Sequence, residues 1–184
     1  MVVEVVAYDP AWPDRFEALR AEYAAALAAA GVPVVAIEHV GSTAVPGLAA
    51  KPVVDVDLVV AEENVGAASE VLVGLGFEPL GERGIPLRWA FRAPQRLGRT
   101  NTSVVVDGSL ALRNHRAVRD TLRADPALRA AYAGVKLRVG RTAADIDEYG
   151  AGKEDVVQRI LAAAGLSEAD RASIGANQVP PRTV

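Results

Sequence analysis

Residues 52–60, PVVDVDLVV, constrain the fold of this chain more than any other stretch. The β-branched residues favour a strand. Apolar side chains occur on both of its faces, as in a strand that is buried from both sides. Two carboxylates, Asp55 and Asp57, interrupt this apolar pattern. Because alternate residues of a strand point to the same side, both carboxylates are predicted to share one face of an otherwise buried strand.

Two neighbouring carboxylates on an apolar surface repel each other, so at least one pKa should rise unless a cation joins them. Hard cations such as Mg²⁺ select carboxylate oxygens, and Mg²⁺ usually shares its shell with phosphates. Asp55 and Asp57 therefore point to a Mg²⁺ site with a nucleoside triphosphate as substrate. A solvated edge strand with two exposed acids is the alternative that so short a motif leaves open.

A second motif, Gly41-Ser42-Thr43, follows a β-branched stretch at 32–40. Backbone N–H groups at such a strand-to-helix turn, with a hydroxyl beside them, form an anion site that suits a phosphate. The alternative is an ordinary connection in which Ser42 or Thr43 caps a short helix. Together, the two motifs place a phosphate cradle beside a metal-binding pair.

The other elements follow from hydrophobic periodicity and turn signals. Strands are predicted at 2–8, 32–40, 52–60, 87–94 and 101–109, with the last two forming a hairpin, and 77–86 is predicted to be a loop. Helices are predicted at 14–31, 62–76, 109–124, 126–140 and 142–164, and an interruption of the last helix at 149–152, YGAG, stays open. Strands and helices alternate first, and helices then follow alone. This order predicts an α+β domain over residues 1–166, with a C-terminal helical layer over about 109–164 and a flexible tail at 167–184.

Composition excludes several functions. The chain of 184 residues has no cysteine and two histidines, which excludes thiolate metal sites and disfavours a zinc site. A net charge of −3 disfavours nucleic acid as a partner. No signal peptide and no membrane span are predicted, so a cytoplasmic location is expected. A homodimer stays open, since short aliphatic chains often dimerise.

Four segments carry a resemblance to a known family: YDPAWPDRFEALR, IEHVGSTAVPGLAAKPVVDVDLVV, LRADPALRAAYAGVKLRV and YGAGKEDVVQRIL. Over about residues 4–164, the chain resembles the GrpB family of small bacterial proteins, and more broadly the nucleotidyltransferase superfamily typified by DNA polymerase beta. The resemblance implies a small mixed nucleotidyltransferase-like sheet flanked by helices. It also implies Gly41 and Ser42 at a triphosphate and one or two Mg²⁺ ions on Asp55 and Asp57.

Such a protein would transfer a nucleoside monophosphate to an acceptor, here an unknown small molecule. The superfamily also uses a third carboxylate from a later strand, and Asp107 is the acid near that place. Lys153, with Tyr149, matches the family's C-terminal Y…K pattern and is expected at the nucleotide phosphates. A surface position for Lys153 is the alternative.

The roles of the other basic residues are predicted from their positions in the sequence alone. Lys51 lies between the turn and the acids and is expected to meet a phosphate, unless it is a solvated loop lysine. Arg88 and Arg92 share one strand face and could hold a triphosphate or an acidic substrate; a solvated sheet face is the alternative. His39 is expected to be a hydrogen-bonded structural residue. The arginines between 113 and 138 are interleaved with acids and are predicted to be solvated.

One departure from the GrpB pattern keeps a second function open. Family members carry histidines, in a pattern like HxxH, at positions that match Asn101 and Val104 here. The alternative to an enzyme is therefore a catalytically altered or inactive nucleotide-binding, accessory domain. A glycosyltransferase that uses Asp-x-Asp is a third reading, although the Gly-Ser cradle has no clear task in it.

Overall fold

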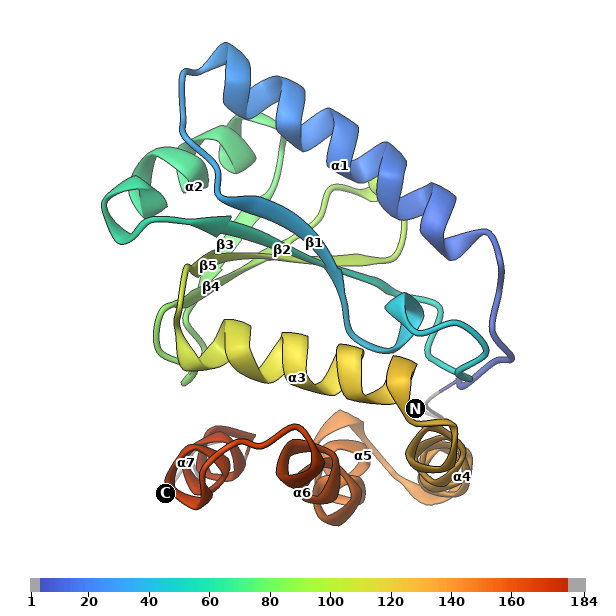
Figure 1. Ribbon diagram of the computed structural model, residues 1–184. Helices are drawn as coiled ribbons and strands as arrows, with labels where there is room; N and C mark the ends of the chain where they lie inside the picture. The colour runs from blue at the N-terminus through green and yellow to red at the C-terminus, as the bar shows by residue number, and fades with distance from the viewer. Residues whose placement is uncertain (1–3, 179–184) are drawn as a thin grey trace.

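The computed structural model describes residues 4–178, apart from the side chains at 146, 147, 177 and 178. Figure 1 shows a twisted sheet with helices α1 and α2 on one face and helix α3 on the other. Helices α4 to α7 form a further layer beyond α3. Within the described residues, none of the helices combines the length and the apolar character needed to cross a bilayer.

The helices and strands follow the predicted order with four differences: residues 4–8 form no named strand, β3 and α7 are additional, and the helix predicted at 142–164 is divided into α5 and α6. Three short 3-10 turns lie between these elements. The first half contains α1 (Trp12–Ala29), β1 (Ala36–Val40), η1 (Ser42–Ala44), β2 (Val54–Val60), η2 (Glu62–Asn64), α2 (Val65–Gly74) and β3 (Glu78–Gly81). The second half contains β4 (Arg88–Arg92), η3 (Gln95–Leu97), β5 (Thr100–Val106), α3 (Leu110–Ala124), α4 (Pro126–Thr142), α5 (Ile146–Ala151), α6 (Glu154–Ala163) and α7 (Glu168–Gln178).

The sheet is mixed, with strand order β1-β2-β5-β4-β3. Strands β2 and β5 are parallel, and every other neighbouring pair is antiparallel. The predicted strand at 52–60 is confirmed as β2, which lies between β1 and β5, and the predicted hairpin is confirmed as β4 and β5. The predicted α+β class and mixed sheet are also confirmed.

The two faces of the sheet differ in chemistry. On the face toward α1 and α2, Val54, Val56 and Leu58 are buried with Val104 in the largest apolar core. Helix α1 adds a stripe at the predicted helical spacing, which consists of Phe16, Leu19, Tyr23 and Leu27. On the face toward α3, the apolar cluster is small and is built around Val59, Val105, Ala111 and Leu112. This second face is therefore free to carry polar residues at its other end.

The loop between η1 and β2 joins the sheet to the helical layer. Its side chains Val45 and Leu48 are fully buried, and they lie in a core formed mainly by α3, α4 and α6. That core also contains Leu122 and Ile160. Burial of the loop places Ser42 and Lys51, at its two ends, next to the helical layer.

Two predicted strands are shorter than expected. Of the strand predicted at 2–8, residues 1–3 lie outside the described part, and Val6 makes only an isolated bridge with Ala50. The strand predicted at 32–40 begins at Ala36. Residues before Ala36 lie outside its register with β2, which starts at the Ala36–Val59 pair.

Two predicted irregular segments form regular structure instead. Residues 77–86 include β3, an edge strand whose register with β4 shifts between Pro79 and Gly81; glycine and proline are tolerated in such an edge strand. Most of the predicted tail at 167–184 is helix α7, which is anchored by buried Ile174, while residues 179–184 lie outside the described part. A single buried large side chain gives too weak a period to reveal the helix in the sequence.

Candidate functional site

A row of polar side chains crosses the sheet on the face toward α3. Register aligns Val40, Asp55, Asn101 and Arg92 across four strands. Two residues further along, it aligns Glu38, Asp57, Ser103 and Ala90. Asp55 and Asp57 therefore share one face, as the alternation of the strand predicts.

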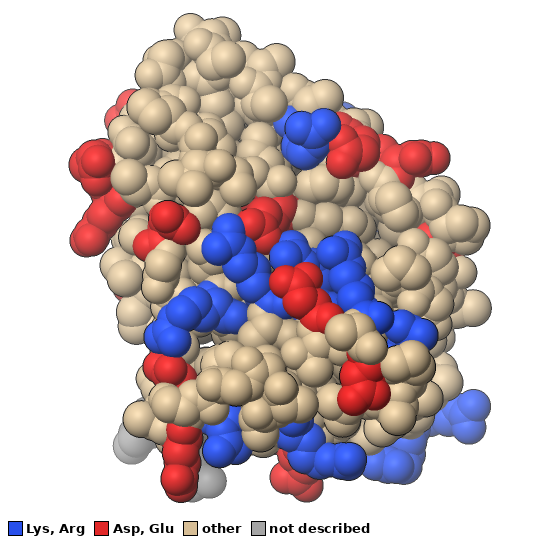
Figure 2. All heavy atoms as spheres, in the orientation of Figure 1, with Lys and Arg blue, Asp and Glu red and all other residues tan. Residues whose placement is uncertain are grey.

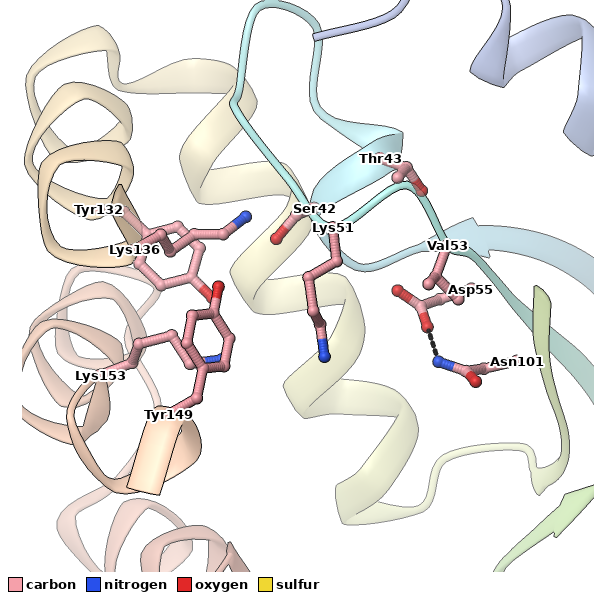
Figure 3. Close-up of a pocket in the computed structure, with 10 residues that line it drawn as sticks. All are labelled: Ser42, Thr43, Lys51, Val53, Asp55, Asn101, Tyr132, Lys136, Tyr149 and Lys153. Atoms are coloured by element: carbon pink, nitrogen blue, oxygen red, sulfur yellow. Dashed lines mark hydrogen bonds between the residues drawn. The ribbon is translucent and has the colours of Figure 1, made fainter. Parts of the chain in front are cut away.

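Asp55 lies directly against the Gly41 turn. A Cβ atom at Gly41 would overlap Asp55 Oδ2, and Gly41 has a φ of 69°, a left-handed conformation that favours glycine. Asn101 Nδ2 donates a hydrogen bond of 2.8 Å to Asp55 Oδ1 (Figure 3). Burial raises the pKa of Asp55, although the Asn101 hydrogen bond acts in the opposite direction. The carboxylate and the Gly-Ser turn are thus neighbours, as the combined motifs predict.

Asp57 is buried and is held by a histidine from α3. His115 Nδ1 lies 2.6 Å from Asp57 Oδ2, and the Asp57 residue is 2% exposed. Burial by itself lowers the pKa of His115, but the charge and hydrogen bond of Asp57 outweigh burial and raise it. No arginine makes an ion pair with Asp55 or Asp57 within residues 4–178, so no guanidinium clamps the acids.

The turn after β1 presents Ser42, but not the Thr43 hydroxyl, to the cavity beside Asp55. Thr43 Oγ1 is 3.0 Å from His39 Nε2. The His39 ring stacks on Phe16, with ring centroids 4.7 Å apart. Burial lowers the pKa of His39 to about 4, so His39 is neutral near pH 7. The predicted structural role of His39 is confirmed, and the Thr43 hydroxyl is engaged with His39.

All three lysines of the chain line this one cavity, although the chain has 20 lysines and arginines in total. The cavity has a volume of about 230 Å³. Lys51 comes from the loop before β2, Lys136 from α4, and Lys153 from the N-terminal end of α6. Figure 3 shows Lys136 and Lys153 on the side of the cavity opposite Asn101, with Lys51 between Tyr149 and Asp55. Its other lining residues are Ser42, Thr43, Val53, Asp55, Asn101, Tyr132 and Tyr149.

Two tyrosine rings separate the lysines. Lys153 Nζ is 4.2 Å and Lys51 Nζ is 5.3 Å from the ring centroid of Tyr149, which are cation–π distances. Lys136 Nζ is 5.2 Å from the ring centroid of Tyr132 and also donates to the carbonyl of Ala49 at 2.7 Å. These contacts hold three ammonium groups together although they repel one another.

Burial destabilises the charges of these lysines. The pKa of Lys136 is lowered to about 7 and that of Lys153 to about 8. Burial is the largest cause of both shifts, and the charges of neighbouring lysines contribute to them. Burial also lowers the pKa of Lys51. The Tyr149 hydroxyl is buried without a hydrogen-bond partner within the described residues. A polyanion in the cavity would stabilise the ammonium groups and could accept a bond from Tyr149.

Asp107 does not reach the site. It follows β5, and its N–H donates to Val60 O at 2.9 Å. Because β2 and β5 run parallel in register, Asn101, not Asp107, is the β5 residue beside Asp55. Six residues of strand separate Asn101 from Asp107, which corresponds to about 20 Å. The expectation that Asp107 is the third carboxylate is therefore wrong.

Arg92 also lies outside the lysine cavity. It forms an exposed ion pair with Glu78 at 2.7 Å. Arg88 shares its sheet face, as predicted, but lines a neighbouring cavity with Asp55 and Asp57. The phosphate role expected for Arg92 has no support in this geometry, because Glu78 already neutralises the guanidinium.

The arginines of α3 attach the helical layer to the sheet. Arg116 and Arg119 both pair with Glu38 of β1, and Arg123 donates to the carbonyl of Ala44. Figure 2 shows basic side chains in a band with acidic ones among them, between the two halves of this face. The prediction that these arginines are merely solvated is wrong at these positions.

Comparison with known proteins identifies the family. The family model described as GrpB protein matches residues 2–163. The chain belongs to the GrpB family. A GrpB protein from Enterococcus faecalis of known crystal structure is similar over 89% of this chain and 100% of that one, with a TM-score of 0.74 and 28% identity.

Curated relatives have names that state no activity. The UPF0157 protein YqkA of Bacillus subtilis is 30% identical over 85% of this chain, and PA4798 of Pseudomonas aeruginosa is 38% identical over 86%. The alignments cover 45% and 66% of those two relatives, so this chain spans only part of their length.

More distant structures share the fold. The Cid1 poly(U) polymerase, in a crystal with MgGTP, is similar over 80% of this chain and 50% of its own, with a TM-score of 0.58 and 15% identity. This likeness shows that the GrpB chain has a nucleotidyltransferase-like fold, as the sequence resemblance predicts.

The two positions at which GrpB relatives are expected to carry histidines lie on opposite faces of β5. Asn101 binds Asp55, whereas Val104 is fully buried in the core beneath α1 and α2. Positions i and i+3 of a strand cannot share a face. Only the departure at Asn101 therefore bears on the site.

The residues of the site fit a Mg²⁺ ion that arrives with a nucleotide. Among the described residues, no group of three or more His, Cys, Asp or Glu side chains is placed to hold a metal ion. Mg²⁺ commonly uses one or two carboxylates and completes its shell with water and substrate phosphates. Asp55 and Asp57 meet that requirement, and the lysine cavity beside Asp55 provides room for phosphates.

Sequence reasoning missed three residues of the site: His115, Tyr132 and Lys136. Nothing local in the sequence marks His115, because its partner Asp57 is distant in the chain. Lys136 had a usable signal. In a chain whose basic residues are almost all arginine, each of the few lysines merits attention, since a compact ammonium and a planar guanidinium are not interchangeable.

Proposed function

We propose that this GrpB-family chain is a Mg²⁺-dependent nucleotidyltransferase that moves a nucleoside monophosphate from a nucleoside triphosphate to a hydroxyl group of a small molecule. The observation that carries the proposal is the convergence of Lys51, Lys136 and Lys153 beside Asp55. Three ammonium groups in one cavity suit a triphosphate, because each can donate to phosphate oxygens and offset their charge.

The site residues have separate tasks in this proposal. The lysines hold the β- and γ-phosphates, and backbone groups of the Gly41–Ser42 turn contact the triphosphate. Asp55 and Asp57 would hold Mg²⁺, which when bound orients the α-phosphate and neutralises the leaving group. The acceptor oxygen forms a bond to the α-phosphorus. The bond between that phosphorus and the oxygen that bridges the α- and β-phosphates breaks. Pyrophosphate then leaves, and the hydroxyl proton passes to water.

The fold supports a nucleotide as the substrate class. The Cid1 structure that shares this fold holds MgGTP, and catalysis by positioning and charge stabilisation suits a site of lysines and carboxylates. That likeness does not indicate which nucleotide base or which acceptor this chain uses.

Calorimetric titration with ATP, GTP, CTP and UTP, with and without Mg²⁺, tests the proposal. We expect Mg²⁺-dependent binding that Lys136→Met weakens by about tenfold or more, since a charge-assisted hydrogen bond contributes about 1.5–3 kcal/mol. Arg138→Met is the matched control, because Arg138 is exposed on the same helix and does not line the cavity. Absence of nucleotide binding by the wild type would refute the proposal.

A nucleotide-binding domain without catalysis is the second candidate. Two observations favour it: an amide, Asn101, and not a third carboxylate lies beside Asp55, and His115 already occupies one oxygen of Asp57. A pyrophosphate-release assay with a panel of hydroxyl acceptors separates the candidates. Pyrophosphate that depends on Asp55 supports the transferase, whereas Mg²⁺-dependent binding with no pyrophosphate supports the binding domain.

A further inference from the structure

A second and larger cavity adjoins the lysine cavity along the polar face of the sheet. Its volume is about 570 Å³, within the range of roughly 300–1,000 Å³ that is usual for small-molecule sites. The two cavities share Asp55 and Asn101. Beyond these shared residues, the second cavity contains Asp57, Ser103 and His115, together with two arginines, Arg83 and Arg88. Arg88 lies opposite Val105, two residues along β5 from the Ser103 that pairs with Asp57. A molecule in the cavity would therefore meet both carboxylates and guanidinium groups.

Arg88 is an arginine without a partner. It is half-buried, its Nε atom is shielded from solvent without a hydrogen bond, and its side chain makes no ion pair within residues 4–178. By contrast, Arg92 on the same strand face pairs with Glu78, and Arg116 on α3 pairs with Glu38. The charges of Asp57 and Asp55 act on this half-buried guanidinium without contacting it directly, so an anionic ligand would add the hydrogen bond that Nε lacks.

The loop that leads into Arg88 has an unusual backbone. Arg83 and Leu87 are non-glycine residues with φ of 51° and 62°. Such conformations are rare and cluster at binding sites, where surrounding structure enforces them. Leu87 is fixed by a hydrogen bond of 2.7 Å from its N–H to the Glu82 carboxylate. The loop thus presents Arg83 and Arg88 to the cavity at a conformational cost.

We infer that this second cavity is the acceptor site, and that the acceptor is a small hydroxyl compound carrying a carboxylate or phosphate group that binds Arg88 and Arg83. This inference rests on the proposed nucleotidyl transfer, because it assigns the acceptor of that reaction. The acceptor hydroxyl lies at the Asp55 and Asp57 end, beside the nucleotide phosphates. Its anionic group lies at the arginine end.

The charges around the cavity favour a small molecule over a nucleic-acid end. A nucleic-acid acceptor would need a track of unpaired basic side chains along its backbone phosphates. The arginines of α3 on the face in Figure 2 are instead engaged: Arg116 and Arg119 pair with Glu38, and Arg119 also pairs with Asp120. The arginines of α3 therefore do not supply such a track.

The test uses inorganic phosphate and acetate as probes while the nucleotide site is saturated with Mg²⁺ and a non-hydrolysable analogue of the nucleoside triphosphate that binds most tightly. Binding is followed by calorimetry and by the ¹⁵N resonance of Arg88 Nε. We expect an anion site that the analogue does not displace and that shifts this resonance. Arg88→Gln should weaken that site by about tenfold, as expected for loss of one charge-assisted bond, and Arg88→Lys should restore part of it. The tighter of the two probes identifies phosphate or carboxylate as the anion.

Arg92→Gln is the matched control, since Arg92 shares the strand and sheet face of Arg88 but lies outside this cavity. It should leave the anion site unchanged, and all variants should bind the triphosphate analogue like the wild type. No analogue-resistant anion binding by the wild type, or equal binding by Arg88→Gln, would overturn the inference. So would displacement of phosphate from Arg88 by a short oligoribonucleotide at micromolar concentration. Failure of the wild type to bind an analogue of any of the four nucleoside triphosphates refutes the proposed function separately, before any probe is added.

Discussion

Gly41 and Asp55 depend on each other. The turn can approach the carboxylate only because Gly41 has no side chain, and its positive φ suits glycine on separate grounds. The sequence motif predicts this juxtaposition well, because the turn and the Asp-x-Asp strand are close in the chain. Asn101 and His115, which orient the two carboxylates, come from distant segments and could not be predicted from local patterns.

Gly41→Ala tests this dependence, with Gly47→Ala as the matched control. Gly47 also has a positive φ, of 78°, but a Cβ there would meet no atom within 4 Å. Gly47→Ala should lose about 1 kcal/mol of stability from backbone strain. Gly41→Ala should lose more, up to about 3 kcal/mol, because a φ of 69° with a ψ of −167° is a conformation essentially restricted to glycine. Only Gly41→Ala should also displace Asp55 and weaken Mg²⁺-dependent nucleotide binding, by about tenfold or more. Equal nucleotide affinities in calorimetry would show that Asp55 does not need the turn.

The two histidines should titrate in opposite directions from their ordinary value of 6.5. Burial keeps His39 neutral until about pH 4, whereas Asp57 keeps His115 protonated above pH 6.5. The raised pKa of His115 stabilises the fold at low pH, and this contribution is lost as pH rises through that pKa. Imidazole NMR titration of the protein without metal measures both values directly. Two similar midpoints near 6.5 would contradict the packing of both rings.

Helix α7 illustrates what element-level patterns can and cannot predict. Helix α1 repeats large apolar residues over 18 residues, so its period is strong. Helix α7 is joined to the rest of the helical layer through Ile174 and through a bidentate pair between Arg113 and Asp170. Contacts of this kind are tertiary and leave almost no mark on the local sequence.

Ile174→Ala should therefore lower the free energy of unfolding by about 2–4 kcal/mol, because it empties a buried position. Arg113→Gln removes the ion pair between Arg113 of α3 and Asp170 of α7. This variant should lower the free energy of unfolding by less than about 1 kcal/mol. Urea denaturation measures both. A negligible effect of Ile174→Ala would mean that α7 contributes little to the helical layer.

At the scale of the whole molecule, the site lies where the sheet meets the helical layer. The fold class, the polar face and most of the cradle could be predicted from β2 and the turn before it. Lys51 and Lys153 are each expected at the phosphates, Lys153 from the family resemblance. The shared cavity with Lys136 could not be predicted, because Lys136 and Lys153 approach Lys51 only when the buried loop residues Val45 and Leu48 dock into the helical core. That docking depends on packing between segments about 80–110 residues apart, beyond any local period.

The buried Lys136 ammonium should lower the free energy of unfolding of the unliganded protein, compared with an apolar side chain at the same position. Its pKa falls from 10.5 to about 7 on folding, so the unfolded chain binds more protons between these values and stability rises with pH across that window. Lys136→Met should therefore stabilise the unliganded protein at pH 6, by about 1–3 kcal/mol, and less at pH 9. Urea denaturation at both pH values, with Arg138→Met as control, measures the difference. A stability difference that does not change with pH would contradict the burial of the charge.

Because every lysine in this sequence lines one cavity, all side-chain primary amines of the protein lie at one site. Coupling the protein to a surface through ε-amino groups would block the very site under study, whereas attachment through carboxylates elsewhere would spare it. An amine-acylating reagent would conversely report whether the cavity is occupied. Acylation of the lysine side chains, counted by mass spectrometry, should fall as a ligand fills the cavity.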